Sequence, residues 1–179
     1  MNSKEYLFKR MKFTSNTSIL IPDIMEVHTQ ALAKFICPLL KKGDTVLLYG
    51  NVGSGKTSLA RHIIQNRFIL QGVVVDEVPS PTFTLVQFYD SIFPPIWHVD
   101  LYRLSNEYEL IELDFLDNLN SCICLIEWPE IMRRYIPLRH ISIKFDCNNT
   151  DHKKRDISLE MHGKDWEYLT RKFFDSSIG

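Results

Sequence analysis

A glycine-rich segment limits the possible folds of this chain more than any other part of its sequence. Residues 50–57 read GNVGSGKT, which fits the pattern G-x-x-x-x-G-K-T, and they lie between an apolar run at 45–49 and a segment with helical periodicity. Glycines allow a backbone to wrap closely around phosphate, and successive N–H groups at a helix N-terminus bind anions. The order of strand, glycine loop and helix therefore predicts a phosphate-binding loop.

The last residues of this loop indicate its ligand. Lys56 supplies a flexible cation for the β- and γ-phosphates of a nucleotide, and the hydroxyl of Thr57 can bind Mg²⁺. Proteins with such a loop that select guanine normally carry an N-K-x-D segment, and this sequence has none. We therefore expect ATP as the nucleotide, bound together with Mg²⁺.

Strand-like and helical patterns alternate along the remaining sequence. Besides 45–49, strands are expected at 73–75, 82–89, 96–100, 121–127, 141–145 and 157–161. Helices are expected from a capping box at Asp23 and Glu26, after the glycine loop, from Asn106 to about Leu119, and over 164–174. This alternation predicts a layered α/β domain of the P-loop NTPase type with a mostly parallel, mixed central sheet.

The length of 179 residues fits one compact domain. No internal repeat, low-complexity tract or long linker rich in proline, glycine and serine divides the sequence. Residues 1–18 are polar, and we expect them to form a flexible N-terminal lead-in. Residues 19–179 are then a single P-loop ATPase domain.

Two of the expected strands end in a carboxylate. Asp100 closes the strand at 96–100, and Glu127 closes the strand at 121–127. A phosphate-binding loop needs an acid on the metal side, and the carboxyl ends of parallel strands meet at one edge of a sheet. We therefore expect both acids to lie near Thr57, around a shared Mg²⁺.

Four motifs in series carry a resemblance to a known family. Residues 50–57 are the glycine loop, 80–86 read SPTFTLV, 98–103 read HVDLYR, and 126–129 read IEWP. In this order and approximate spacing they resemble the TsaE (YjeE) family. The resemblance implies a bacterial ATPase that acts with TsaB and TsaD proteins to make threonylcarbamoyladenosine in tRNA.

The resemblance also implies a role for each matched residue. Lys56, Asp100 and Glu127 are the catalytic candidates, with Asp100 the acid that orients water. Thr57, Glu127 and Asp100 are the metal candidates. The nucleotide-binding candidates are Gly53, Ser54, Gly55, Lys56, Thr57, Ser58, Thr82, Trp128 and Asp23. Ser80 and Thr82 are expected on a switch-like loop near the γ-phosphate, and Asp23 is equally explained as a plain helix N-cap.

Two other functions remain open from the sequence. A small P-loop kinase would use the same loop to transfer phosphate to a small-molecule acceptor, but no arginine-rich insertion that could form a lid is present. A nucleotide-gated binding module would bind ATP and hydrolyse it only incidentally. Release of phosphate to water distinguishes the ATPase from the kinase.

Three further polar features each allow two interpretations. His98 is on the same strand face as Asp100 and is either a general base or a hydrogen-bonded structural residue. Arg103 could approach phosphate or pair with a local carboxylate. The basic cluster at 152–155 is expected at a hairpin tip, solvated or in contact with RNA.

Composition limits the partners and the compartment. The 22 acidic and 21 basic residues give a net charge of −1, so no overall basic field draws the chain to nucleic acid, and we expect tRNA contact to be indirect. No apolar run approaches the roughly 20 residues that span a bilayer. The four cysteines form no metal-binding pattern, and Cys122 and Cys124, two positions apart in an apolar run, are expected to be buried thiols. We therefore expect a cytoplasmic protein without a membrane segment.

Overall fold

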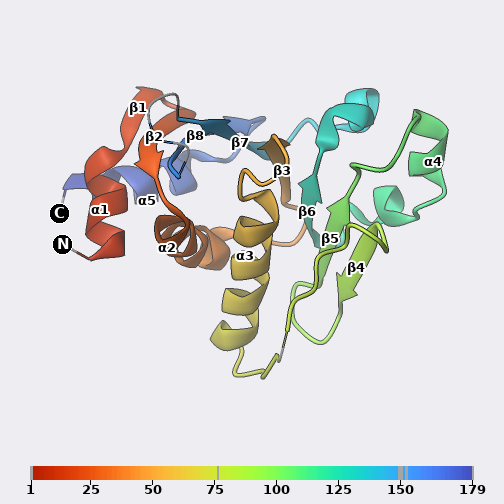
Figure 1. The fold of residues 1–179 in the computed structure, drawn as a ribbon. Helices are drawn as coiled ribbons and strands as arrows, with labels where there is room; N and C mark the ends of the chain where they lie inside the picture. Colours follow the sequence, from red (N-terminus) through yellow and green to blue (C-terminus); the bar gives the residue numbers. More distant parts are fainter. Residues whose placement is uncertain (1, 76, 149–150, 152, 179) are drawn as a thin grey trace.

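An eight-stranded sheet crosses the whole molecule in the order β1-β2-β8-β7-β3-β6-β5-β4 (Figure 1). The structure is a computed structural model, and it describes residues 2–75, 77–148, 151 and 153–178. The strands are β1 (Lys12–Ser15), β2 (Ser18–Ile24), β3 (Thr45–Gly50), β4 (Val86–Tyr89), β5 (Ile96–Asp100), β6 (Ile123–Glu127), β7 (His140–Cys147) and β8 (Arg155–His162).

The four central strands of this sheet are parallel. β3 pairs with β7 on one side and with β6 on the other, and β6 pairs with β5. In this register Glu127 lies opposite both Leu48 and Asp100. The strand-tip acids and the end of β3 therefore share one edge of the sheet, as the sequence predicts, because parallel strands end at the same edge.

Alternating residues of the central strands bury both faces of the sheet. Val46 and Leu48 of β3 join a core with α2 (Glu26–Ile36) and α3 (Lys56–Leu70). Leu47 joins a second core on the opposite face, which is covered by α4 (Glu107–Ile111) and two short helices, η2 (Phe115–Asn118) and η3 (Pro129–Tyr135). This two-sided burial explains why the strands read as continuous apolar runs. The predicted layered α/β fold with a mixed sheet is confirmed.

The remaining strands pair antiparallel at the two ends of the sheet. β4 pairs with β5 at one end, whereas β1, β2, β8 and β7 form a four-stranded antiparallel flank at the other. Helices α1 (Ser3–Arg10) and α5 (Glu167–Ile178) contact each other beside this flank, and α1 also contacts α2 (Figure 1). The helices over the flank lie far apart in sequence but complete one core.

The expected flexible lead-in over residues 1–18 differs from the structure. Residues 3–10 form α1, which Asn2 caps by accepting a hydrogen bond from the N–H of Glu5. Leu7 and Phe8 are buried in the main core, and β1 follows directly. The segment looks polar in sequence because only one side of a short helix reaches the core.

Four other local expectations were wrong. No strand forms at residues 73–75, and the strand expected over 82–89 is confined to β4 because 82–85 form a turn. The helix expected from Asn106 to about Leu119 is divided into α4 and η2 at Asp114, which has a positive φ of 54°. Asp23 is no helix N-cap, since it belongs to β2 and α2 is preceded by Met25.

The expectation of buried thiols at Cys122 and Cys124 is confirmed. Cys37, Cys122 and Cys124 are buried, whereas Cys147 is exposed. Burial raises the pKa of Cys124 to about 12 and the pKa of Cys37 to about 11. Within the described part of the chain, no helix combines the length and apolar character needed to cross a membrane.

Candidate functional site

The glycine loop joins β3 to α3 in a backbone path that requires glycine. Gly50 has φ of 136°, and a Cβ placed there would come within 2.6 Å of the carbonyl oxygen of Phe145. Gly55 has φ of 110° and directly precedes α3, which begins at Lys56. Both φ values lie in the region that only glycine adopts at little cost. Because Gly55 is the N-cap residue of α3, the first N–H groups of that helix lie at the end of the loop and can bind an anion.

Lys56 is held inside this loop. Its Nζ donates hydrogen bonds to the carbonyl oxygens of Gly50, at 2.7 Å, and Asn51, at 2.9 Å. The same Nζ lies 3.8 Å from the centre of the Trp128 ring, which fits a cation–π contact. Burial lowers the pKa of Lys56, and the negative charges of Glu127, Asp100 and Glu130 oppose that shift.

Thr57 and Glu127 form a short polar contact across the sheet edge. The Thr57 hydroxyl donates to Oε2 of Glu127 at 2.7 Å. The other carboxylate oxygen, Oε1, is 2.9 Å from Nε2 of His98, a side chain with no solvent exposure. Glu127 itself is 1% exposed. One buried carboxylate is thus oriented from two sides, and His98 is a hydrogen-bonded neighbour of that acid.

Asp100 connects the next strand to the segment that contains Ser80 and Thr82. The Thr82 hydroxyl donates to Oδ2 of Asp100 at 2.7 Å, and the N–H of Tyr102 donates to Oδ1 at 3.0 Å. The hydroxyls of Ser80 and Thr82 are 2.9 Å apart. Arg103 donates to the carbonyl oxygen of Phe83 at 3.2 Å, so it contacts this segment instead of a carboxylate. A strand-tip acid therefore holds the expected switch-like loop.

A groove of about 210 Å³ lies beside the glycine loop. Its lining residues come from the loop, from α3, from the end of β2, from the start of α2 and from the β7–β8 hairpin: Ile24, Met25, Glu26, Thr29, Gly53, Ser54, Gly55, Ser58, Lys153 and Arg155. Arg155 also reaches the loop directly, because its Nη2 is 3.4 Å from the carbonyl oxygen of Gly53. The groove continues the phosphate loop towards the antiparallel flank.

The structure brings most of the predicted site residues together and sets one apart. Lys56, Thr57, Asp100, Glu127 and Trp128 gather at the sheet edge through the contacts given above, with Thr82 on Asp100. Gly53, Ser54, Gly55 and Ser58 line the groove.

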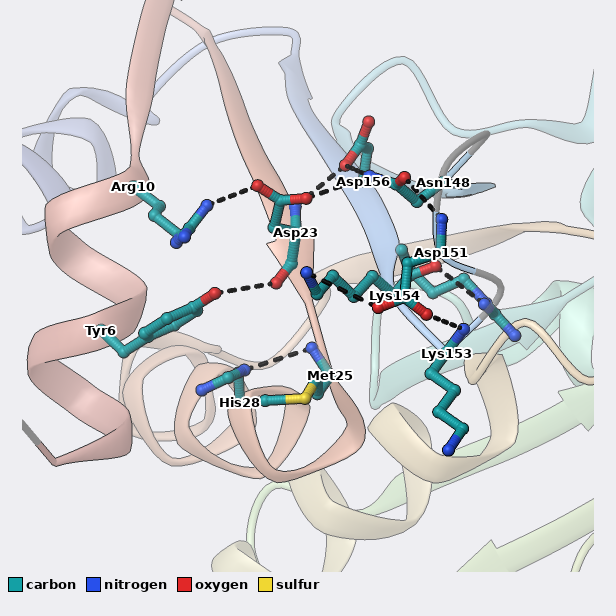
Figure 2. Close-up of polar contacts among 11 residues, drawn as sticks. Tyr6, Arg10, Asp23, Met25, His28, Asn148, Asp151, Lys153, Lys154 and Asp156 are labelled. Carbon is teal, nitrogen blue, oxygen red and sulfur yellow. Dashed lines mark hydrogen bonds and ion pairs between the residues drawn. The ribbon is translucent and has the colours of Figure 1, made fainter.

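Asp23 lies outside the lining of the groove. Its carboxylate is held by Arg10 at 2.5 Å and by Nδ2 of Asn148 at 3.1 Å (Figure 2).

Sequence reasoning missed Met25, Lys153 and Arg155 as residues of the site. It assigned the basic cluster at 152–155 to solvent or RNA, and residue 152 lies outside the described residues. Arg155 reaches the loop only because β8 pairs with both β7 and β2. The sequence shows that Lys153 and Arg155 are positively charged and belong to a predicted hairpin. It does not show that this hairpin lies beside the glycine loop.

These features define a protein of the P-loop NTPase fold: a glycine loop, the helix that follows it, and two acids at strand ends on a central parallel sheet. The crystal structure of YdiB from Bacillus subtilis has the same fold: it superposes with a TM-score of 0.71 over 92% of this chain and 96% of that one, at 22% sequence identity.

Sequence comparison identifies the family. Residues 25–157 match the family model described as threonylcarbamoyl adenosine biosynthesis protein TsaE. A relative from Rickettsia felis, named tRNA threonylcarbamoyladenosine biosynthesis protein TsaE, is 40% identical over 75% of this chain and 75% of its own length. A Bacillus subtilis protein of the same name is 30% identical over 79% of this chain and 85% of its own length. The chain belongs to the TsaE family.

Proposed function

We propose that this chain is a Mg²⁺-dependent ATPase that supports TsaB and TsaD proteins in making threonylcarbamoyladenosine in tRNA. The observation that carries the proposal is the 2.7 Å contact between Thr57 and Glu127, at the edge of the sheet where Lys56 and the glycine loop also lie. A hydroxyl and an acid placed across from a phosphate loop are the parts that P-loop ATPases use. Relatives named as tRNA threonylcarbamoyladenosine biosynthesis proteins support the pathway.

The side chains at the sheet edge suit Mg²⁺. Thr57, Glu127 and Asp100 offer only oxygen donors, which Mg²⁺ prefers, and Thr57 keeps its lone pairs available while it donates its proton to Glu127. Within the described residues, no group of three or more histidine, cysteine or acidic side chains could hold a metal ion by itself. That fits Mg²⁺, which is bound by one or two carboxylates together with phosphate oxygens and water. Mg²⁺ would neutralise charge on the phosphate oxygens.

The residues of the loop supply binding and charge. Lys56 and the loop N–H groups hold the β- and γ-phosphates, since the ammonium is already positioned inside the loop. The Ser54 hydroxyl is buried, and no residue that the structure describes bonds to it, so a phosphate oxygen gives it an acceptor. The groove beside Gly53 receives the nucleoside. Catalysis then depends on placement and electrostatic stabilisation more than on covalent chemistry.

Asp100 and Thr82 link hydrolysis to a change in shape. Asp100 orients the attacking water, and the hydrogen bond from Thr82 ties the loop of residues 80–84 to the same carboxylate. Loss of the γ-phosphate changes the surroundings of Asp100 and so changes this loop. The loop in turn alters the fit to TsaB and TsaD. Contact with tRNA is indirect, and the process belongs to the cytoplasm.

The test is release of inorganic phosphate from ATP by the purified chain, with Mg²⁺ or with a chelator. Glu127→Gln keeps the size of the side chain and removes its charge. We expect it to lower Mg²⁺-dependent turnover about tenfold or more, while ATP binding in chelator changes little. Glu112→Gln, the same change at an exposed position that contacts none of the site residues named above, is the matched control.

Other outcomes would decide against parts of the proposal. Equal loss of turnover and of Mg²⁺-free binding in Glu127→Gln would assign Glu127 to folding. Phosphate found on an added acceptor instead of water would favour the kinase. A hydrolysis-deficient variant that still supports tRNA modification would favour the nucleotide-gated binding module. Capture of TsaB and TsaD by the chain, measured with and without ATP, tests the partners directly.

A further inference from the structure

The N-terminal helix α1 lies outside residues 25–157, which match the family model, yet it is tied to the groove beside the phosphate loop. Two of its side chains, Tyr6 and Arg10, point towards Asp23 in β2 (Figure 2). Arg10 also packs over the Tyr6 ring, with 4.5 Å between the guanidinium carbon and the ring centre. From these two residues, contacts lead to both walls of the groove.

The first wall is reached through His28. The Tyr6 ring stacks on the His28 ring with 4.0 Å between centroids, and Nδ1 of His28 accepts a hydrogen bond from the N–H of Met25 at 3.1 Å. Met25 lines the groove. Burial and the charge of Arg10 lower the pKa of His28, which keeps the neutral ring that this acceptor role requires. Tyr6 therefore supports the turn that begins α2.

The second wall is reached through Asp23 and the hairpin between β7 and β8. Nη1 of Arg10 lies 2.5 Å from Oδ2 of Asp23, and Nδ2 of Asn148 donates to Oδ1 at 3.1 Å. Oδ1 of Asn148 accepts from the N–H of Asp151 at 3.2 Å. Oδ1 of Asp151 accepts from the N–H of Lys153 at 3.0 Å, and Lys153 lines the groove.

Asp23 itself departs from regular strand geometry. It has a positive φ of 60°, and the pairing of β2 with β8 shifts register between Ile21 and Ile24. Its N–H donates to the side chain of Asp156 at 2.9 Å instead of to the strand ladder. A positive φ costs energy in a residue with a Cβ, so several partners are needed to hold it. Arg10 and Tyr6 supply two of them from α1.

We infer that α1 positions both walls of the groove for the nucleoside part of the nucleotide, with Arg10 as the positioning residue. This rests on the proposed function, because it assumes that the phosphates occupy the glycine loop. Arg10 does not touch the ligand: it fixes Asp23, and Asp23 fixes the hairpin that carries Lys153. The effect is confined to the end of the site that binds base and ribose, since the contacts of Lys56, Thr57 and Glu127 involve no residue of α1.

Two ligands separate these ends of the site. ATP fills the loop and the groove, whereas inorganic tripolyphosphate fills the loop alone. Arg10→Gln in the full chain is expected to raise the Kd for ATP about three- to tenfold and to leave the Kd for tripolyphosphate unchanged, as for a residue that acts through a contact network. Lys9→Gln removes the same charge from the exposed neighbouring position and should change neither value.

A cycle with Asp23→Asn keeps the inference testable if Arg10→Gln alone lowers stability. When Asp23→Asn is already present, adding Arg10→Gln should change the ratio of the two Kd values by less than about twofold, since the pair acts as one unit. If the ratio of the Kd for ATP to the Kd for tripolyphosphate is the same in Arg10→Gln as in the unaltered chain, the inference is overturned and the proposed function stands. Equal weakening of the binding of both ligands is one such outcome. Failure of the unaltered chain to bind either ligand would overturn both.

Discussion

The parallel centre of the sheet and its antiparallel flank contribute to the same site in different ways. In the centre, Lys56 and Thr57 come a few residues after the end of β3, and Glu127 is the last residue of β6. Short sequence motifs are therefore enough to predict where these residues lie. In the flank, Asp23 meets Arg10 and Asn148 through pairings of β2 with β8 and packing of α1. Strand ends determine the chemistry of the loop, whereas long-range packing determines the shape of the groove beside it.

The largest effect is expected at the centre. Lys56→Ala should weaken ATP binding about 100-fold or more, because each lost hydrogen bond to a charged partner costs about 1.5–3 kcal/mol and Lys56 serves two phosphates. Titration of a fluorescent ATP analogue or calorimetry measures the Kd. Lys42→Ala, at an exposed position before β3, is the control. An affinity near that of the unaltered chain would remove the phosphate-loop assignment and, with it, the contrast between the two regions.

A smaller effect is expected at Asp100, and it should affect turnover more than binding. Asp100→Asn keeps the acceptor for Thr82 on one oxygen and removes the charge that orients water. Turnover should fall about 100-fold, at the lower end of what such groups contribute, while the Kd for ATP stays within about twofold. Single-turnover phosphate release measures the turnover, and titration measures the Kd for ATP.

Asp117→Asn, at an exposed position in η2, is the matched control for Asp100. Turnover in Asp100→Asn equal to that of the unaltered chain would reassign Asp100 to holding the 80–84 loop only. The centre would then owe its chemistry to Glu127 and Lys56 alone.

Much of the centre could be predicted from sequence because its signals are local. A continuous apolar run predicts β3 and β6, and the G-x-x-x-x-G-K-T pattern predicts the turn into α3. The meeting of Asp100 and Glu127 needs only the rule that parallel strands end at one edge. The motifs predicted that Thr82 lies near the site, but they did not predict that its hydroxyl bonds to the carboxylate of Asp100.

The flank could not be predicted in the same way because its contacts join distant residues. Arg10 and Asp23 are 13 residues apart, and Asp23 and Asn148 are 125 apart, so no periodicity connects them. Asp23 followed three residues later by Glu26 matches the sequence pattern of a capping box. In the structure, however, residues 18–24 pair with β8 as a strand of the sheet. The polar composition of residues 3–10 also misled the prediction. The burial of Leu7 and Phe8 in the core is enough to hold α1 in place.

The smallest effect on the nucleotide is expected from α5, the other terminal helix beside the flank. Leu169 of α5 is fully buried, and Leu169→Ala should lower the free energy of unfolding by about 2–5 kcal/mol, with each kcal/mol lowering the Tm by about 2–4 °C. Below that Tm the Kd for ATP should stay within about twofold, because none of the described side chains of α5 lines the groove.

Leu138→Ala, at a leucine that is 93% exposed, is the control for the same change in volume. Thermal unfolding and ATP titration on the same preparations give both numbers. A rise in the Kd for ATP that parallels the loss of stability would mean that the whole flank, and not α1 in particular, sets the groove. Unchanged affinity in Leu169→Ala beside weakened affinity in Arg10→Gln would restrict that role to the contacts that run from α1 through Asp23.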